Sequence, residues 1–186
     1  MSRTILYLYA FCIALCGCQV RHAVSQPVEE RGMKGFAKDS AILLSAKKAL
    51  FHHKFKNVKA MVHQGTILLC GFVDNNVAKE VASMVTESIK GVQKVINEID
   101  IQPQKKRYTF KDTFLSQKAQ SRLFLDARIP SRNYHITVLR STLYIIGTAQ
   151  STTEKQWVVS HMEQVSGVNR LVTHIFVKQN NHKSAP

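Results

Sequence analysis

The sequence predicts an α+β protein built from two tandem copies of one unit, each with the order helix, strand, strand, helix, strand. Three observations predict it: 45% of the 186 residues are apolar, one pattern of residue types occurs twice, and the apolar spacing alternates between helical and strand periods. That apolar fraction excludes a wholly disordered or collagen-like chain. In each unit we expect an α-β-β-α-β fold, with two helices packed on one face of a three-stranded mixed sheet.

The repeat appears as matching residue types at a nearly constant offset. Lys38-Asp39-Ser40 is matched by Lys111-Asp112-Thr113 at an offset of 73. Later positions match at an offset of 76: Gly71 and Gly147, Gly91 and Gly167, Val95 and Leu171. The second copy therefore holds three extra residues before Gly147, which a surface loop absorbs at low cost.

The first helix of copy one is predicted from apolar residues at positions i, i+4, i+7 and i+8, which share one helical face. These residues are Ile42, Ala46, Ala49 and Leu50. Asp39 or Ser40 is expected to cap this helix, because either side chain accepts hydrogen bonds from free backbone amides.

Strands and a second helix follow in copy one. Val58, Ala60 and Val62 occupy alternate positions, as in a half-buried strand, and residues 66–73 form a second strand after a turn. Apolar residues at helical spacing predict a helix from about residue 77 to Gly91, and residues 95–101 form the last strand. The second copy repeats this order, with helices at 113–126 and 152–166 and strands at 133–139, 143–149 and 171–177.

Residues 1–17 have the features of a lipoprotein signal peptide. A positive start, Met1-Ser2-Arg3, precedes an uncharged stretch from Thr4 to Leu15. As a helix that stretch would span only about 18 Å, against a hydrocarbon core of ~30 Å, which favours a cleaved signal over a spanning helix. The run Leu15-Cys16-Gly17-Cys18 resembles the bacterial lipobox. An ordinary secretory signal that contains cysteines is the alternative.

The lipobox resemblance implies a covalent lipid anchor on Cys18. It implies a diacylglycerol on the sulfur, cleavage before this residue and an N-acyl chain on the new amine, and we expect no other cofactor. Gln19 follows Cys18, which by the same resemblance implies transport to the outer membrane, with the protein facing the periplasm. Cys70 is then the only cysteine left, so neither an internal disulfide nor a cysteine-based zinc site is expected.

The positive charge is distributed unevenly along the chain. A formal net charge of +14 indicates an anionic partner, and export argues against nucleic acid as that partner. Lys105, Lys106 and Arg107 lie close together just before the first helix of copy two, where they would give electrostatic support at an anionic surface. A solubilising linker is the alternative. We expect six segments: a lipoprotein signal peptide (1–17), a lipidated tether (18–37), the first unit (38–101), a basic linker (102–111), the second unit (112–178) and a polar tail (179–186).

Residues 65–73 and 91–101 of copy one resemble the BON domain. The second copy resembles it less closely, because Ser141 stands in the place of Gly65 and Thr173 in the place of Asn97. A lipobox followed by two such domains resembles the dual-BON outer-membrane lipoproteins, which are related to the OsmY family. The resemblance implies a non-enzymatic protein that binds anionic phospholipid and supports outer-membrane integrity, with its membrane contact on the first helix of the second domain.

The lipid-binding residues are predicted on that helix, outside its apolar core stripe. Cations can pair with lipid phosphates, and large apolar side chains can enter the headgroup region. The candidates are Lys111, Phe114, Lys118, Arg122 and Leu125. The alternative for these residues is an ordinary solvated helix face. The alternative function is a periplasmic adaptor or chaperone-like module, in which an exposed sheet edge binds an envelope protein.

The remaining chemistry-bearing residues indicate neither an enzyme nor a metal site. His52 and His53 are adjacent, so on a helix their side chains diverge by about 100°. His135 and His174 lie on separate predicted strands without a neighbouring carboxylate motif, and His161 takes the place of the apolar Val85 of copy one, as a half-buried packing residue. The sequence contains no phosphate-binding loop, nucleophile elbow or zinc-protease helix. We therefore expect no catalytic residues and no metal ligands.

Overall fold

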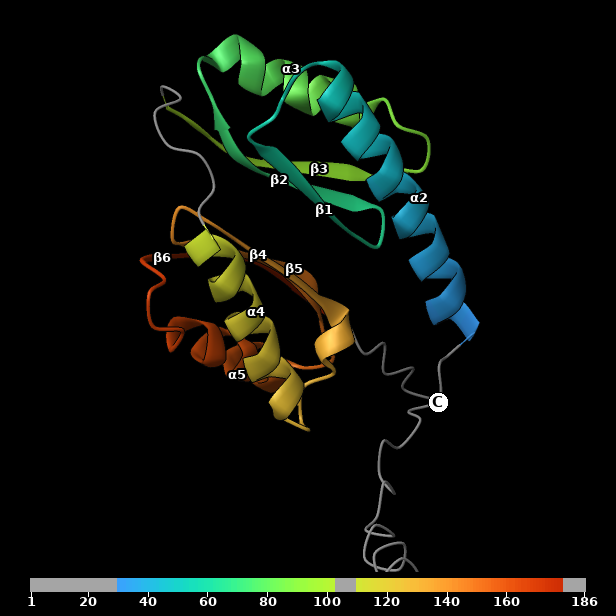
Figure 1. The fold of residues 1–186 in the computed structure, drawn as a ribbon. Helices are drawn as coiled ribbons and strands as arrows, with labels where there is room; N and C mark the ends of the chain where they lie inside the picture. The colour runs from blue at the N-terminus through green and yellow to red at the C-terminus, as the bar shows by residue number, and fades with distance from the viewer. Residues whose placement is uncertain (1–29, 103–109, 179–186) are drawn as a thin grey trace, which may run out of the picture. The chain divides into compact units, whose positions relative to one another are not determined.

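Residues 30–102 and 110–178 are described by a computed structural model, which contains two α-β-β-α-β units in tandem. We call the unit from α2 to β3 domain 1 and the unit from α4 to β6 domain 2 (Figure 1). The described residues from Lys34 onward belong to one compact unit. Within the described ranges, each helix is too short or too polar to cross a membrane. The predicted signal peptide, Cys18 and the polar tail lie outside the described residues.

Domain 1 is an α+β unit whose central strand is β2. Its elements are α2 (Glu30–His52), β1 (Val58–His63), β2 (Thr66–Val73), α3 (Asn76–Glu87) and β3 (Lys94–Ile101). Strand β2 pairs antiparallel with β1 and parallel with β3, which makes the sheet mixed. Asn75 caps α3 by accepting a hydrogen bond from the Ala78 amide at 2.8 Å.

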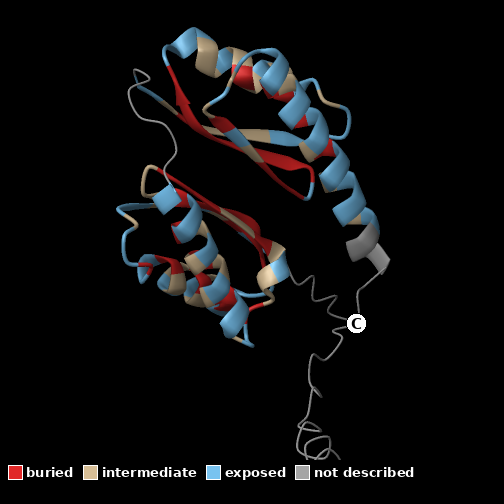
Figure 2. Cartoon of the chain, viewed as in Figure 1, coloured by how far each residue is buried: buried red, intermediate tan, exposed pale blue. Residues whose placement is uncertain are grey.

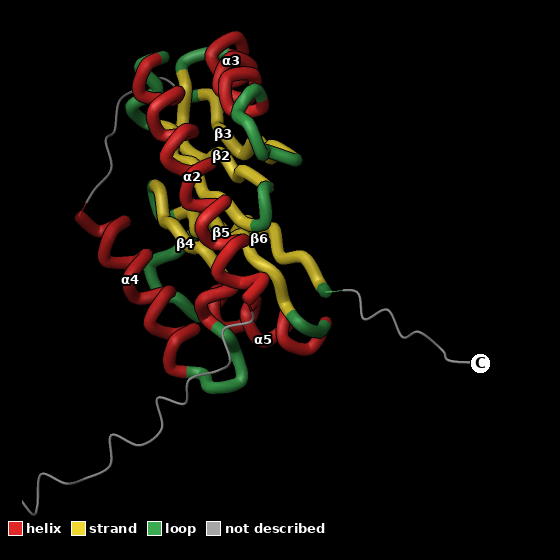
Figure 3. Tube along the Cα trace, turned by 90° about the vertical axis from the view of Figure 1, so that its right-hand side faces the viewer, coloured by secondary structure: helices red, strands yellow, loops and turns green. Residues whose placement is uncertain are grey.

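Domain 2 repeats this topology around its central strand β5. Its elements are α4 (Phe110–Leu125), the short 3-10 helix η1 (Ser131–Asn133), β4 (Tyr134–Leu139), β5 (Thr142–Ala149), α5 (Thr152–Glu163) and β6 (Arg170–Val177). Strand β5 pairs antiparallel with β4 and parallel with β6. The predicted fold class, two helices on one face of a three-stranded mixed sheet in each unit, is confirmed (Figure 3).

Each domain has its own apolar core between its helices and its sheet. In domain 1 it contains Ile42, Ala46 and Leu50 of α2, and in domain 2 the equivalent residues of α4. Figure 2 shows that buried positions are concentrated on the strands, while much of each helix surface is exposed. Close backbone packing explains why glycine recurs at the equivalent positions 71 and 147. A Cβ at Gly71 would lie 2.0 Å from the Asn57 carbonyl oxygen, and a Cβ at Gly147 would lie 2.3 Å from the Asn133 carbonyl oxygen.

The predicted helix cap at Asp39 or Ser40 is wrong, because α2 begins at Glu30. Asp39 lies inside the helix, and its carboxylate accepts hydrogen bonds from the backbone amides of Gln64 at 2.7 Å and Gly65 at 2.9 Å. These amides belong to the turn between β1 and β2. The carboxylate therefore fixes the hairpin to the helix rather than closing the helix end.

Asp112 performs the same task in domain 2, which explains why the Lys-Asp-Ser/Thr pattern occurs twice. It accepts from the amides of Arg140 at 3.0 Å and Ser141 at 3.1 Å. Both of these turn residues have positive φ, +48° and +58°, although neither is glycine. Domain 1 places Gly65 at the second of these positions with φ +74°, so the domain 2 turn is the more strained of the two.

A third apolar cluster joins the two domains through the faces of the sheets that the helices leave uncovered. It consists of Met61, Leu68, Cys70 and Phe72 from domain 1 with Leu139, Tyr144 and Ile146 from domain 2. Polar contacts surround it, among them His63 Nε2 at 2.8 Å from Thr148 Oγ1. His174 Nε2 lies 3.0 Å from Glu98 Oε1, and these residues occupy equivalent positions in the two copies. Contact between residues at equivalent positions of two copies is typical of an interface with approximate two-fold symmetry.

Candidate functional site: the outer face of helix α4

Helix α4 has a buried face and an exposed apolar face on opposite sides. Leu115, Ala119 and Leu123 are buried at i, i+4 and i+8 and pack on the sheet. At about 100° per residue, the exposed residues Phe110, Phe114, Phe124 and Leu125 lie on the side turned away from that core. They are between 64% and 98% exposed. We call these four residues the α4 stripe.

The sequence prediction found half of the α4 stripe. It named Phe114 and Leu125, which are exposed as expected. It did not include Phe110, because the helix is predicted to begin after that residue, and it did not include Phe124. The i, i+4 spacing of Phe110 and Phe114 was the available signal.

The predicted cations lie on one flank of α4, beside the α4 stripe. Lys111 is exposed, whereas Lys118 and Arg122 are half-buried. Lys118 Nζ donates a hydrogen bond to Ser166 Oγ at 2.7 Å, and an Arg122 guanidinium nitrogen donates to the backbone carbonyl of Gln164. Both acceptors lie just beyond α5, where positive charge also interacts favourably with the helix dipole.

The five predicted lipid-binding residues are therefore on one helix but do not form one uniform patch. Phe114 and Leu125 face outward, Lys111 is exposed beside them, and Lys118 and Arg122 are held by the segment after α5. Any lipid contact made by these two cations would compete with their contacts inside domain 2. The supporting residues Lys105, Lys106 and Arg107 lie outside the described residues.

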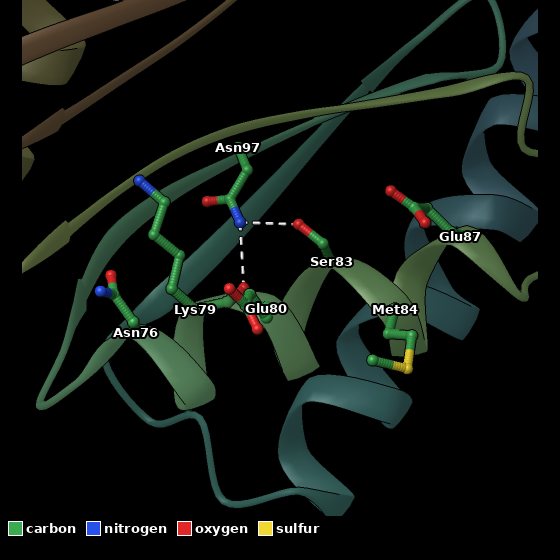
Figure 4. Close-up of a pocket in the computed structure, with 7 residues that line it drawn as sticks. All are labelled: Asn76, Lys79, Glu80, Ser83, Met84, Glu87 and Asn97. Carbon is green, nitrogen blue, oxygen red and sulfur yellow. Dashed lines mark hydrogen bonds between the residues drawn. The ribbon is translucent and has the colours of Figure 1, made fainter.

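A shallow groove of about 450 Å³ lies between α3 and β3 in domain 1 (Figure 4). Its central polar side chain is already engaged, since Asn97 Nδ2 donates to Ser83 Oγ at 2.6 Å and to the Lys79 carbonyl at 3.0 Å. Glu80 and Glu87 also line the groove. The hydrogen bonds of Asn97 hold strand β3 against α3.

The titratable groups with shifted pKa values have structural causes. Burial raises the pKa of the Cys70 thiol to about 12, so this cysteine is unreactive at neutral pH. The pKa of Tyr134 is raised by burial and by its hydrogen bond to Glu154. Hydrogen bonds from Arg128 and then His161 lower the pKa of Asp126. Over residues 30–102 and 110–178, the His, Cys, Asp and Glu side chains form no group of three that could hold a metal ion.

Burial lowers the pKa of both His63 and His135, and the neighbouring His135 lowers that of His63 further. Their rings lie 5.9 Å apart, one from each domain. Asp39 acts in the opposite direction on both. Both imidazoles are therefore favoured in the neutral form where the two sheets meet.

Comparison with known proteins identifies the repeated unit. The family model of the BON domain matches residues 38–103 and 111–179. An uncharacterized protein in the gshII 5′ region of Anaplasma centrale is 32% identical over 145 residues, covering 75% of this chain and 95% of that protein. The outer membrane lipoprotein DolP of Haemophilus influenzae is 24% identical over 119 residues, covering 62% of this chain and 60% of that protein. Among solved structures, the C-terminal domain of CdsD from Chlamydia trachomatis aligns over 74% of this chain and 98% of that domain with 9% identity and a TM-score of 0.33, too weak a likeness to bear on function.

Proposed function

This chain belongs to the BON domain family, and on that premise we propose that it is a non-enzymatic lipoprotein of the bacterial envelope. In this proposal the protein is anchored in the outer membrane through Cys18 and faces the periplasm. Domain 2 binds anionic phospholipid, and through that binding the protein supports outer-membrane integrity. The similarity to an outer membrane lipoprotein supports this location.

The observation that carries the proposal is the α4 stripe. Soluble domains seldom expose several large apolar side chains on one helix face without a partner. On α4, three phenylalanines and a leucine do so beside the exposed cation Lys111. This combination suits the boundary between headgroups and acyl chains, where aromatic rings insert and cations pair with phosphates.

The anchor and the helix would have separate roles. Two or three acyl chains on Cys18 would supply stable membrane residence, which a single chain does not. Because the anchor raises the local concentration of lipid, even weak headgroup binding by α4 would be effective. The α4 stripe would insert into the membrane, and the neighbouring exposed cation Lys111 would favour anionic headgroups.

Co-sedimentation of residues 19–186 with lipid vesicles tests the proposal, since this chain lacks the anchor but keeps every described residue. We expect binding to vesicles containing phosphatidylglycerol, weak binding to pure phosphatidylcholine, and loss of binding at high salt. The double variant Phe110→Ser/Phe114→Ser should bind the anionic vesicles at least about tenfold more weakly. Val77→Ser/Met84→Ser is the matched control, because it removes two exposed apolar side chains from α3 instead.

Two results would contradict the proposal. Absence of binding to either vesicle would leave the predicted anchor as the membrane contact and favour the envelope-protein adaptor. Equal binding by the α4 variant and its α3 control would remove the α4 stripe from the lipid site.

A further inference from the structure

Helix α2 of domain 1 has an outward face of a different kind from that of α4. Leu44, Lys48 and Phe51 follow i, i+4, i+7 spacing and lie on the side of α2 opposite its buried residues. Leu44 is 56% and Phe51 is 82% exposed. Two large apolar side chains therefore project from this side of α2. Ala37 and Ala41 are exposed as well, and Phe36 of the same helix is 71% exposed.

The charge around these side chains is almost entirely positive. Six lysines on and just after α2 are exposed: Lys34, Lys38, Lys47, Lys48, Lys54 and Lys56. Within the described part of the chain, none of the six forms an ion pair. Asp39 is the one carboxylate between residues 34 and 56, and it is turned to the hairpin amides. On α4, by contrast, Lys118 and Arg122 are held by domain 2 itself.

We infer that this surface, which we call the α2 face (Lys34, Lys38, Leu44, Lys47, Lys48 and Phe51), is a second contact for an anionic phospholipid bilayer. The α2 face would bind the same class of ligand as α4 does in the proposed function, but it belongs to domain 1. The inference rests on the proposed function for the presence of a membrane, and not on lipid binding by α4.

Charge and chain length favour a bilayer as the occupant. Exposed lysines surround this face, and the one nearby carboxylate, Asp39, already accepts two backbone hydrogen bonds, so the surface complements lipid phosphates. A protein interface usually has few lysines at its centre. Lys48 lies between Leu44 and Phe51 on this side of the helix, so each of these two apolar side chains can enter the headgroup region beside a cation. The chain between Cys18 and Lys34 can extend over at most about 55 Å, so an anchor on Cys18 would keep the α2 face close to the membrane.

A fluorescent label at position 44 reports directly on the α2 face. In residues 19–186 the native cysteine is Cys70, which is fully buried and has a pKa raised to about 12, so a maleimide dye reacts with an introduced surface cysteine instead. An environment-sensitive dye on Leu44→Cys should brighten and shift to the blue with phosphatidylglycerol vesicles. The same dye on Met84→Cys, an exposed position on α3, should not change.

Charge reversal tests the electrostatic part of the inference. Lys47→Glu/Lys48→Glu should lower the partition coefficient onto the anionic vesicles by at least about tenfold. Lys90→Glu/Lys94→Glu changes the net charge equally at two exposed lysines away from α2 and should lower it less. This control separates a local contact from a general effect of charge.

The outcomes distinguish this inference from the proposed function. A silent dye at position 44, with equal effects of the two charge variants, would overturn the inference while leaving α4 as a lipid site. Loss of binding in the α2 variant with an unaffected Phe110→Ser/Phe114→Ser variant would support the inference and reject the proposed role of α4. Absence of any vesicle binding would overturn both.

Discussion

Helices α2 and α4 occupy equivalent places in the two domains, yet only their buried faces are alike. Ile42, Ala46 and Leu50 of α2 are repeated as Leu115, Ala119 and Leu123 of α4. On the outer side, the positions of Phe110 and Phe114 are held in α2 by Ala37 and Ala41. Packing against the sheet constrains the inner face of both helices, whereas the outer face is free to differ between the copies.

The basic residues of α2 and α4 also occupy different positions on the two helices. At the positions of Lys118 and Arg122, α2 has Ser45 and Ala49, and its lysines are placed elsewhere on its exposed surface. Domain 2 uses those two cations to hold the segment after α5. A cation on a candidate binding helix therefore has to be examined for contacts within its own domain before it is assigned to a ligand.

Among changes that compare the two domains, substitution of the equivalent glycines Gly71 and Gly147 should alter the free energy of unfolding most. We expect Gly71→Ala to lower the free energy of unfolding by roughly 3–5 kcal/mol, because the new Cβ would lie 2.0 Å from the Asn57 carbonyl oxygen and φ is +131°. Gly147→Ala also meets a carbonyl, at 2.3 Å, but without a positive φ, so its loss should be smaller. Urea unfolding measures both, and Gly35→Ala, with open space around the site, is the control. Equal unfolding midpoints for all three variants would contradict the expected packing.

Removal of the hairpin carboxylates should have the next largest effect. We expect Asp112→Ala to cost about 2–3 kcal/mol and Asp39→Ala about 1–2 kcal/mol, since each carboxylate accepts two backbone hydrogen bonds but Asp112 is the more buried. Thermal unfolding of both variants tests the order. A greater loss of stability in Asp39→Ala than in Asp112→Ala would contradict the expectation that the domain 2 turn depends more strongly on its carboxylate than the domain 1 turn does.

The contact between the sheets should make stability depend on pH. The pKa values of His63 and His135 are lowered in the fold, so the unfolded chain binds more protons below the ordinary value of 6.5. Stability is therefore full above pH 6.5, and the free energy of unfolding should fall as the pH is lowered from 7.5 to 5.5. His63→Leu, which copies Leu139 at the equivalent position of domain 2, should flatten the profile. His52→Gln/His53→Gln, at exposed positions, should leave it unchanged.

Substitutions in the β1–β2 and β4–β5 turns should change the free energy of unfolding least. Ser141→Gly should stabilise the protein by about 0.5–1 kcal/mol, because φ is +58° and glycine adopts such angles without strain. Gly65→Ser should destabilise the protein by at least as much, because φ is +74° and the new Cβ would lie 3.1 Å from Gln93 Cγ, and urea unfolding of the two variants measured together can resolve both changes. A destabilising Ser141→Gly would show that the serine makes a compensating interaction.

Much of the fold follows from local patterns in the sequence. The apolar period of 3.6 locates the buried faces of α2 and α4. The start of α2 at Glu30 was not predicted, since residues 30–37 include Gly35 and lack apolar periodicity. The entirely buried β2 also carried a signal: its unbroken apolar run is typical of a strand covered on both faces.

The candidate site could be predicted only in part. Sequence spacing separates the core side of α4 from its outer side, which placed Phe114 and Leu125 correctly on the surface. Spacing does not reveal that Lys118 and Arg122 reach residues more than 40 positions away, because those contacts depend on the packing of α5. Lipid binding by this helix and acylation of Cys18 stay predictions.

The apolar cluster between the sheets has a consequence for biosynthesis. Domain 1 has all of its own strands once Ile101 has been made, but Leu68, Cys70 and Phe72 lack their cover until β5 is complete, about 50 residues later. At roughly 5–20 residues per second, the ribosome needs several seconds to supply it. Until then, the apolar side chains on the uncovered face of the domain 1 sheet lack the packing partners that Leu139, Tyr144 and Ile146 supply in the finished protein.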